Sequence, residues 1–230
     1  MRAIALAILI LLTACGSKNE RLLKQLGMEE IAKKRFDIET FDRNKRKEQG
    51  YISNNNDSIY EFTDSTGVYH EQTSTDKFYY EKIIYPDSLV YDAYVFYRNG
   101  AIKIFGRSLI KGVVNLGNLV YFDEQGNVTE VINRDEPYKF TLEQVLDYMK
   151  KNDIDIWDKN VGLYRGLGSE HDPFPDVYTW LITIRFWDYT EEERRSGKKI
   201  TIAKFKERSI ELDAVTGGVK QDTTVVLESY

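Results

Sequence analysis

Short apolar strands separated by glycine-containing turns recur along residues 51–134, and this pattern constrains the fold more than any other feature. Three turns carry it, at Asp64–Gly67, Arg98–Gly100 and Asp123–Gly126. Alternating, β-branched and aromatic residues flank each turn, which predicts antiparallel hairpins. One hairpin cannot bury its apolar face alone, whereas a stack of three or more can. We therefore expect a ribbon of stacked β-hairpins over this region.

Two of these hairpin segments, Phe96–Lys103 and Val120–Val128, are similar to the degenerate MORN-type repeats of bacterial antitoxin-like and lipoprotein families. The resemblance implies β-hairpins that stack into a twisted ribbon. The Gly-x-Trp of the stricter repeat is absent at Gly117–Leu119, where leucine stands in the tryptophan position. The resemblance therefore implies the stacked-hairpin architecture for residues 51–134, and it implies no function.

A different pattern begins after the polar connector Asn133–Tyr138, which contains Pro137 and is the expected domain boundary. Thr141 and Gln144 have the spacing of a capping box, and apolar residues then repeat at helical spacing as far as Asn152. These apolar residues are Leu142, Val145, Leu146 and Met149. The sequence therefore predicts an amphipathic helix at the start of the second region.

Apolar segments that predict strands follow this helix. The segment Tyr178–Trp187 is largely apolar on both faces, which indicates a central strand. The charged stretch Glu191–Lys199 is expected to be a hairpin loop. The other strands are expected at Val161–Leu167, Ile200–Phe205 and Glu207–Leu212. We therefore expect residues 135–230 to form a helix packed on an antiparallel sheet.

The stretch Ile210–Val219 resembles the end of a PepSY-type module, which closes on Leu-Asp-Ala-x-Thr-Gly-x-Val. That module is a helix followed by an antiparallel sheet. The turn has a physical basis, because Asp213 can accept nearby backbone N–H groups and Gly217 can adopt a positive φ. Members of the family are inhibitory, regulatory or binding modules, and the resemblance brings no enzymatic residue.

Together these patterns predict an α+β, strand-rich protein. Its expected architecture is an antiparallel β-hairpin repeat ribbon followed by a small helix-plus-antiparallel-sheet module. The aromatic content, with 16 Tyr and 11 Phe, favours strands over helices.

The N-terminus has the pattern of an export signal. Arg2 precedes the apolar run Ala3–Leu12, which is shorter than the roughly 20 residues that span a bilayer. The run ends in Leu12–Cys15, which resembles the lipobox of bacterial lipoproteins. The resemblance implies cleavage between Ala14 and Cys15, a diacylglyceryl group on the Cys15 sulfur and acylation of the new amine by a chain such as palmitate. An ordinary signal peptide with an incidental cysteine is the alternative.

Several expectations follow from that resemblance. Residues 1–14 are the signal peptide, residues 15–50 form a lipidated tether with a short helix, and the bilayer is a partner through Cys15. Two or more acyl chains suffice for stable anchoring. Gly16 stands where enteric inner-membrane lipoproteins carry Asp, which favours the outer membrane.

The predicted tether contains two features of its own. Apolar residues at helical spacing predict the short helix between Asn19 and Lys34, interrupted by Gly27. The basic run Asp42–Gln49 is interpreted as a solvated tether or loop. A patch for phosphate or lipid headgroups is the alternative interpretation of that run.

Composition excludes some functions. A formal net charge of −5 argues against nucleic acid as a partner, since proteins that bind it carry basic patches. Cys15 is the only cysteine, so its lipidation leaves no thiol for a disulfide. The fold must then be held by its apolar core.

The residues that catalysis or metal binding would need are few. The two histidines, His70 and His171, each lack a second ligand at the spacing of a zinc site. Ser169, His171 and Asp172 are the residue types of a hydrolytic triad, but neighbours in one loop cannot supply its geometry. We therefore predict no catalytic residue, no metal site and no cofactor.

Two further stretches have competing interpretations. Glu191–Glu193 with Asp188 are carboxylates that suit a hard cation, yet they lack the alternation and glycine of a calcium loop, so a solvated loop is preferred. The aromatic stripe in Tyr178–Trp187 suits a ligand wall, but an aromatic strand is more often core.

Three functional hypotheses remain open from the sequence. The first is a membrane-anchored, non-enzymatic binding protein of the bacterial envelope with an unidentified protein partner. The second is a lipid-tethered immunity or inhibitor protein directed against a toxin or protease. The third, from another class, is an envelope hydrolase that uses His171.

Overall fold

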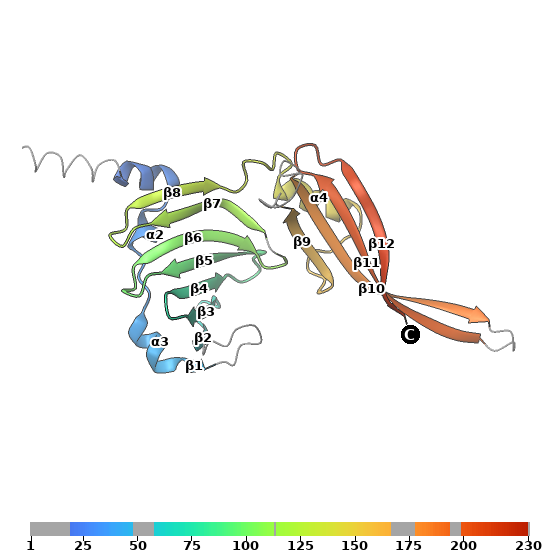
Figure 1. Ribbon diagram of the computed structural model, residues 1–230, viewed down its shortest axis with the longest axis horizontal. Helices are drawn as coiled ribbons and strands as arrows, with labels where there is room; N and C mark the ends of the chain where they lie inside the picture. Colours follow the sequence, from blue (N-terminus) through green and yellow to red (C-terminus); the bar gives the residue numbers. More distant parts are fainter. Residues whose placement is uncertain (1–18, 48–57, 113, 167–177, 194–198, 230) are drawn as a thin grey trace, which may run out of the picture. The chain divides into compact units, whose positions relative to one another are not determined.

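The computed structural model describes residues 19–47, 58–112, 114–166, 178–193 and 199–229. The chain divides into two compact units. The first takes its residues from Met1–Ser108 and Asn115–Arg134, and the second from Leu109–Val114 and Asp135–Tyr230. Both are rich in strands, so the predicted α+β, strand-rich class is confirmed (Figure 1). The division of the chain at residues 14, 50 and 134 stays a prediction.

An eight-stranded antiparallel sheet forms the first unit, and its strands lie in chain order. Each strand therefore pairs with its sequence neighbours, as a succession of hairpins does. The strands are β1 (Arg46–Lys47), β2 (Ser58–Thr63), β3 (Tyr69–Ser74), β4 (Tyr79–Ile84), β5 (Val90–Phe96), β6 (Ile102–Leu109), β7 (Asn115–Phe122) and β8 (Val128–Asn133). The predicted hairpin sheet is confirmed, whereas its likeness to MORN-type repeats stays a prediction.

Three of its hairpins close with turns of the same geometry. A glycine with φ near +80 to +85° donates its N–H to the carbonyl three residues earlier. The N–H to oxygen distances are 3.1 Å for Gly67, 2.9 Å for Gly100 and 3.0 Å for Gly126. The Oδ1 atoms of Asp64 and Asp123 also accept backbone N–H groups two and four residues on. The turns expected from the sequence are therefore present.

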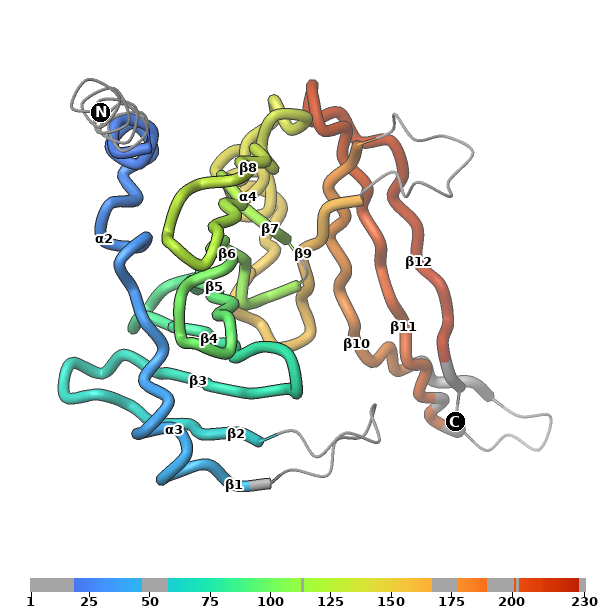
Figure 2. The backbone as a smooth tube through the Cα atoms, turned by 60° about the vertical axis from the view of Figure 1, so that its left-hand side comes forward, coloured from blue at the N-terminus to red at the C-terminus, as the bar shows by residue number. Residues whose placement is uncertain are grey.

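The N-terminal part of the described chain supplies core residues to this sheet. A helical segment over residues 19–26 precedes α2 (Glu29–Lys33) and α3 (Ile38–Asn44). Gly27, with φ +64°, ends the first segment as expected. Leu23, Phe36 and Phe41 are buried against aromatic and aliphatic side chains of the sheet. Figure 2 shows this blue segment running across the strands.

The interpretation of Asp42–Gln49 as a loop is wrong over the described residues 42–47. The helix α3 continues to Asn44, and β1 then pairs with β2. The expected exposure is correct, because residues 42–46 are exposed. Phe41 explains the difference, since its fully buried ring holds α3 on the sheet and leaves only the charged side of the helix in water.

The second unit has a four-stranded antiparallel sheet in the order β12-β11-β10-β9. Its strands are β9 (Val161–Gly166), β10 (Thr179–Glu193), β11 (Lys199–Asp213) and β12 (Val219–Ser229). β10 lies between β9 and β11, so the expected central strand is confirmed. Two expectations are wrong in detail, because Glu191–Glu193 continue β10 instead of opening a loop, and β11 is one strand instead of two. The middle of that expected loop, residues 194–198, lies outside the described residues. The strand β12 was not predicted.

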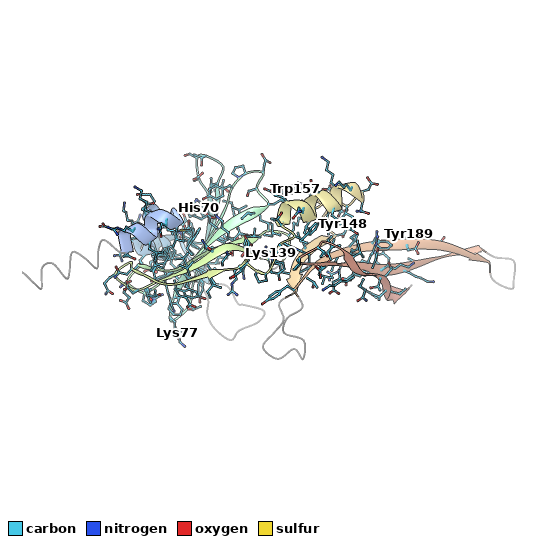
Figure 3. The ribbon with its side chains drawn as sticks, turned by 90° about the horizontal axis from the view of Figure 1, so that it is seen from above. His70, Lys77, Lys139, Tyr148, Trp157 and Tyr189 are labelled. Carbon is cyan, nitrogen blue, oxygen red and sulfur yellow. The ribbon has the colours of Figure 1, made fainter. Side chains whose placement is uncertain are left out.

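Helix α4 (Leu142–Lys151) begins with the predicted capping box. The Gln144 N–H donates to Thr141 Oγ1 at 3.4 Å, and the Thr141 N–H donates to Gln144 Oε1 at 2.8 Å. Val145 and Met149 are fully buried, while Leu142 and Leu146 are partly buried. Figure 3 shows α4, with Tyr148, lying over one face of the second sheet. The helix therefore covers one face of this sheet, as predicted.

Candidate interaction surface

The residues predicted for anchoring, Ala14 and Cys15, lie outside the described residues, so lipid attachment stays a prediction. Ser169, His171 and Asp172 also lie outside them. Within the described ranges, no helix is both long enough and apolar enough to cross a membrane. No three of the described His, Cys, Asp and Glu side chains are placed to hold a metal ion together.

His70 lies in β3 among aromatic and acidic side chains. Its ring stacks on Phe62, with centroids 4.6 Å apart and planes 2° from parallel. Its Nδ1 atom is 3.4 Å from Glu81 Oε1, and its Nε2 atom is 3.7 Å from Asp64 Oδ2. His70 is therefore one member of a polar cluster on the first sheet.

Glu81 is the most buried carboxylate of that cluster. It points to the same side of β4 as the core residues Tyr79 and Ile83. Its Oε1 atom accepts from Gln72 Nε2 at 2.9 Å, and its Oε2 atom is 2.9 Å from Lys34 Nζ. Both oxygens have partners, as a buried carboxylate requires.

Asp92 is a second buried carboxylate on this sheet. Its Oδ1 atom accepts from Arg107 Nε at 3.0 Å, and its Oδ2 atom accepts from the Tyr85 hydroxyl at 3.1 Å. Burial, together with the charges of Asp92 and Glu81, raises the pKa of the neighbouring Tyr94. Burial likewise raises the pKa of Tyr85. These tyrosines stay neutral near pH 7, so the cluster has the character of a satisfied polar network within a fold.

The sequence analysis missed this polar network, although a signal for it exists. In the run from Tyr79 to Ile83, every second side chain faces the core, and Glu81 occupies one of those positions. The same alternation places Asp92 beside Tyr94 and Phe96. A charged residue at an inward position of an alternating strand predicts a buried ion pair. Its partners Lys34 and Arg107 are too far away in sequence to be found by spacing.

The exposed aromatic residues of the second unit are more informative about function. Trp180 and Ile182, in the first half of β10, are fully buried, and Trp180 Nε1 donates to the Phe140 carbonyl at 2.8 Å. Further along the same strand, Trp187 is 45% exposed and Tyr189 is 66% exposed. The interpretation of the aromatic stripe as core is therefore correct for its first half and wrong for its end.

The two faces of β10 and the lengths of the elements explain this change. β10 pairs with β11 in one continuous register, so Trp180 and Ile182 share one face of the sheet and Trp187 and Tyr189 lie on the other. The ten residues of α4 extend about 15 Å at 1.5 Å per residue. The fifteen residues of β10 extend about 50 Å at 3.3 Å per residue. Pairing with β9 also stops at Ile184. The helix covers the face that carries Trp180, so it leaves Trp187 and Tyr189 on the other face uncovered. It is also too short to reach the outer half of β10, where Tyr189 is labelled in Figure 3 beyond the end of α4.

Trp187, Tyr189 and Phe205 form what we call the aromatic surface. Trp187 is paired with Phe205 of β11 across the sheet, and their ring centroids are 5.0 Å apart. Trp187 also stacks on Tyr189, with centroids 6.5 Å apart. Residues two apart in a strand share a face, so the three rings lie on one side of the sheet.

One ion pair flanks the aromatic surface on its own face of the sheet, and a second lies on the opposite face. Arg185 Nε donates to Glu207 Oε2 at 2.8 Å, and Lys206 pairs with Asp188. Asp188, a possible cation ligand together with Glu191–Glu193 on the sequence alone, has this lysine as its partner in the structure. The described part of this surface therefore presents three aromatic rings next to the Arg185–Glu207 ion pair.

Comparison with protein-family models, with curated proteins and with solved structures found no match for this chain.

Proposed function

We propose that this chain is a lipoprotein of the bacterial envelope, anchored in the outer membrane through Cys15, and that it acts as a non-enzymatic binding protein. The aromatic surface on β10 and β11 is the contact surface for its protein partner. The predicted lipobox supports the anchoring part of this proposal, and the exposed rings support the binding part.

The exposure of Trp187 and Tyr189 is the observation that carries the binding function. Tryptophan and tyrosine are enriched at the centres of protein interfaces, where they supply large apolar area with little loss of side-chain entropy. Contiguous exposed apolar residues mark interaction sites in proteins that are otherwise well packed. A core role does not account for these rings, since Trp187 is 45% exposed while Trp180 in the same strand is fully buried.

The anchor is tested with Cys15→Ala, and Ser17→Ala serves as a control that keeps the thiol. We expect Cys15→Ala to accumulate as unprocessed precursor without incorporating labelled palmitate, while Ser17→Ala behaves like the unmodified chain. Membrane fractionation and mass spectrometry of the N-terminal peptide provide the measurements. A Cys15→Ala chain that is still processed and still fractionates with membranes contradicts the anchoring.

The binding function is tested by photocrosslinking in the envelope. A photoreactive phenylalanine analogue replaces Trp187 in one variant and Tyr189 in another. A third variant carries it at Val215, which is 59% exposed and lies in the turn between β11 and β12. We expect one discrete adduct from positions 187 and 189 and none from position 215. No adduct at 187, or the same adducts at all three positions, contradicts the proposal.

A further inference from the structure

The tip of the hairpin formed by β6 and β7 belongs to a different unit from the rest of that hairpin. The chain leaves the first unit after Ser108, contributes Leu109–Val114 to the second unit, and returns to the first unit at Asn115. The remainder of the second unit follows only from Asp135 onward. We call Leu109–Val114 the inserted segment, because a hairpin of the first sheet supplies it to the second unit.

The first sheet holds the two ends of the inserted segment together. Ser108 and Asn115 face each other in the register of β6 and β7, and Ser108 Oγ donates to Asn115 Oδ1 at 2.8 Å. The Leu109 N–H then donates to the Val114 carbonyl at 3.0 Å. Closing a loop costs conformational entropy, and here the hairpin has already closed it. The inserted segment is therefore presented to the second unit as a closed loop.

The inserted segment caps the outer edge of β9. The Leu163 N–H donates to the Lys111 carbonyl at 2.9 Å, and Lys111 Nζ donates to the Asp158 carbonyl at 3.4 Å. Leu163 is fully buried, and it pairs with Ile182 of β10 across the sheet. A buried N–H that loses its partner destabilises the strand that carries it. The order of β9 therefore depends on this contact.

Gly112 brings two backbones into direct contact. It has φ +130°, a conformation that residues with side chains rarely adopt. A Cβ at this position would lie 1.7 Å from the Leu163 carbonyl oxygen, and a backbone atom cannot turn aside as the end of a side chain can. Leu109 and Val114, at the two ends of the segment, are each 1% exposed. Only glycine at position 112 is therefore compatible with the docked segment.

We propose that the inserted segment is a latch by which the first sheet controls the order of β9 and of the first half of β10. While the latch is docked, the edge of β9 is capped and β9 stays paired with β10. When the latch is released, β9 opens by local unfolding. The control runs from the first unit to the second, because the buried core cluster of the first sheet, among the described residues, contains neither Leu109 nor Val114. The aromatic surface also lies on β10, so its availability to a partner would follow the latch, and this last step alone rests on the proposed function.

Hydrogen exchange followed by mass spectrometry tests the latch on the chain from residue 15 onward, with Cys15→Ser so that no lipid and no thiol are present. We expect Gly112→Ala to speed the exchange of peptides from β9 and from the first half of β10 by about tenfold or more. Peptides from β4 and β5, in the first unit, should exchange as in the unmodified chain. Lys111→Ala is the matched control, because it keeps the backbone carbonyl that accepts from Leu163, and it should leave all of these rates within about twofold.

Val114→Ala is a milder second variant that decides the test if Gly112→Ala does not fold. It shortens a buried side chain of the latch and should speed the exchange of β9 by about threefold or more, whereas Val131→Ala, at an exposed valine of β8, should not. A latch variant that folds and leaves the exchange of β9 unchanged, or that speeds β4 as much as β9, overturns the proposal. Exchange is measured without a partner and is independent of the envelope crosslinks at Trp187, so failure of the latch and failure of the proposed function are distinguishable.

Discussion

The two sheets of this protein differ in how completely the rest of their own unit covers them. In the first unit, residues 19–44 supply Leu23, Phe36 and Phe41 to the core, and the inward carboxylates Glu81 and Asp92 have cationic partners. In the second unit, the only described helix covers the face of β10 that carries Trp180 and Ile182, while Trp187 and Tyr189 lie exposed on the opposite face. The comparison shows that the first sheet buries even its inward carboxylates, whereas the second sheet buries one face of β10 and exposes aromatic rings on the other.

Truncating the cover of the first sheet should have the largest effect. Phe41 is fully buried and contacts the stacked rings of Phe36 and Tyr79 edge-on, at centroid distances of 5.3 and 5.7 Å. We expect Phe41→Ala to lower the free energy of unfolding by about 3–5 kcal/mol, measured by denaturant titration. The exposed Trp157→Ala is the control and should change it by less than about 0.5 kcal/mol. A Phe41→Ala chain as stable as the control would mean that residues 38–44 are a tether after all.

A pair of glycines compares the packing of the two units at equal backbone strain. Gly117 and Gly217 have φ of +62° and +72°. A Cβ at Gly117 has no heavy atom within 4 Å, whereas a Cβ at Gly217 meets the Phe140 ring at 2.3 Å. We expect Gly117→Ala to cost about 1–2 kcal/mol from the left-handed conformation alone, and Gly217→Ala to cost more. Thermal unfolding of both variants measures the difference. Equal losses of stability would show that the Phe140 ring can move aside without an energetic penalty.

The closing turn of the second sheet gives a smaller, pH-dependent effect. Hydrogen bonds from the backbone N–H of Thr216, from Lys220 and from the Val215 N–H hold the pKa of Asp213 well below its usual range. A carboxylate with a depressed folded pKa stabilises the fold at pH values above its unfolded pKa of about 3.9. That stabilisation is lost as the pH falls toward the folded pKa.

We therefore expect Asp213→Asn to be less stable than the unmodified chain at pH 7. The difference in stability between the two chains should shrink as the pH falls through about 4. Unfolding midpoints recorded along this pH series measure the effect. The homologous change at Asp123, whose pKa is also lowered by hydrogen bonds from the Asn127 side chain and backbone, is the comparison in the first unit. If the difference in stability between Asp213→Asn and the unmodified chain stays constant with pH, the ionised carboxylate of Asp213 does not stabilise the turn.

Local signals in the sequence predicted much of the fold. The turns at Gly67, Gly100 and Gly126, and the capping box of Thr141 with Gln144, depend on neighbouring residues only, and each is present in the structure. Only one part of the polar network could be predicted from neighbouring residues. The inward position of Glu81 can be read from alternation, but its partner Lys34 comes from a distant segment.

What the sequence could not predict depends on distant packing. Phe41 lies in a charge-rich stretch, and nothing nearby in the sequence indicates that a sheet lies beneath it. Trp180 and Trp187 have similar local surroundings in an apolar strand, yet one is buried and the other exposed, because they lie on opposite faces of β10 and α4 covers only the face of Trp180. The strand β12 was missed because its alternation is weak and its first residues are charged and polar. The candidate surface follows from these long-range differences, and the sequence alone therefore placed Trp187 in the core.

The free energy of unfolding of Trp187→Ser tests the central claim most directly, namely that the aromatic surface serves binding and is not part of the core. The account predicts a loss of at most about 1.5 kcal/mol, the worth of an aromatic pair with Phe205. The same variant should lose the envelope adduct that a photoreactive residue at position 189 forms. A loss of about 3–5 kcal/mol, the cost of truncating a buried aromatic ring, would instead make Trp187 a core residue and contradict the claim.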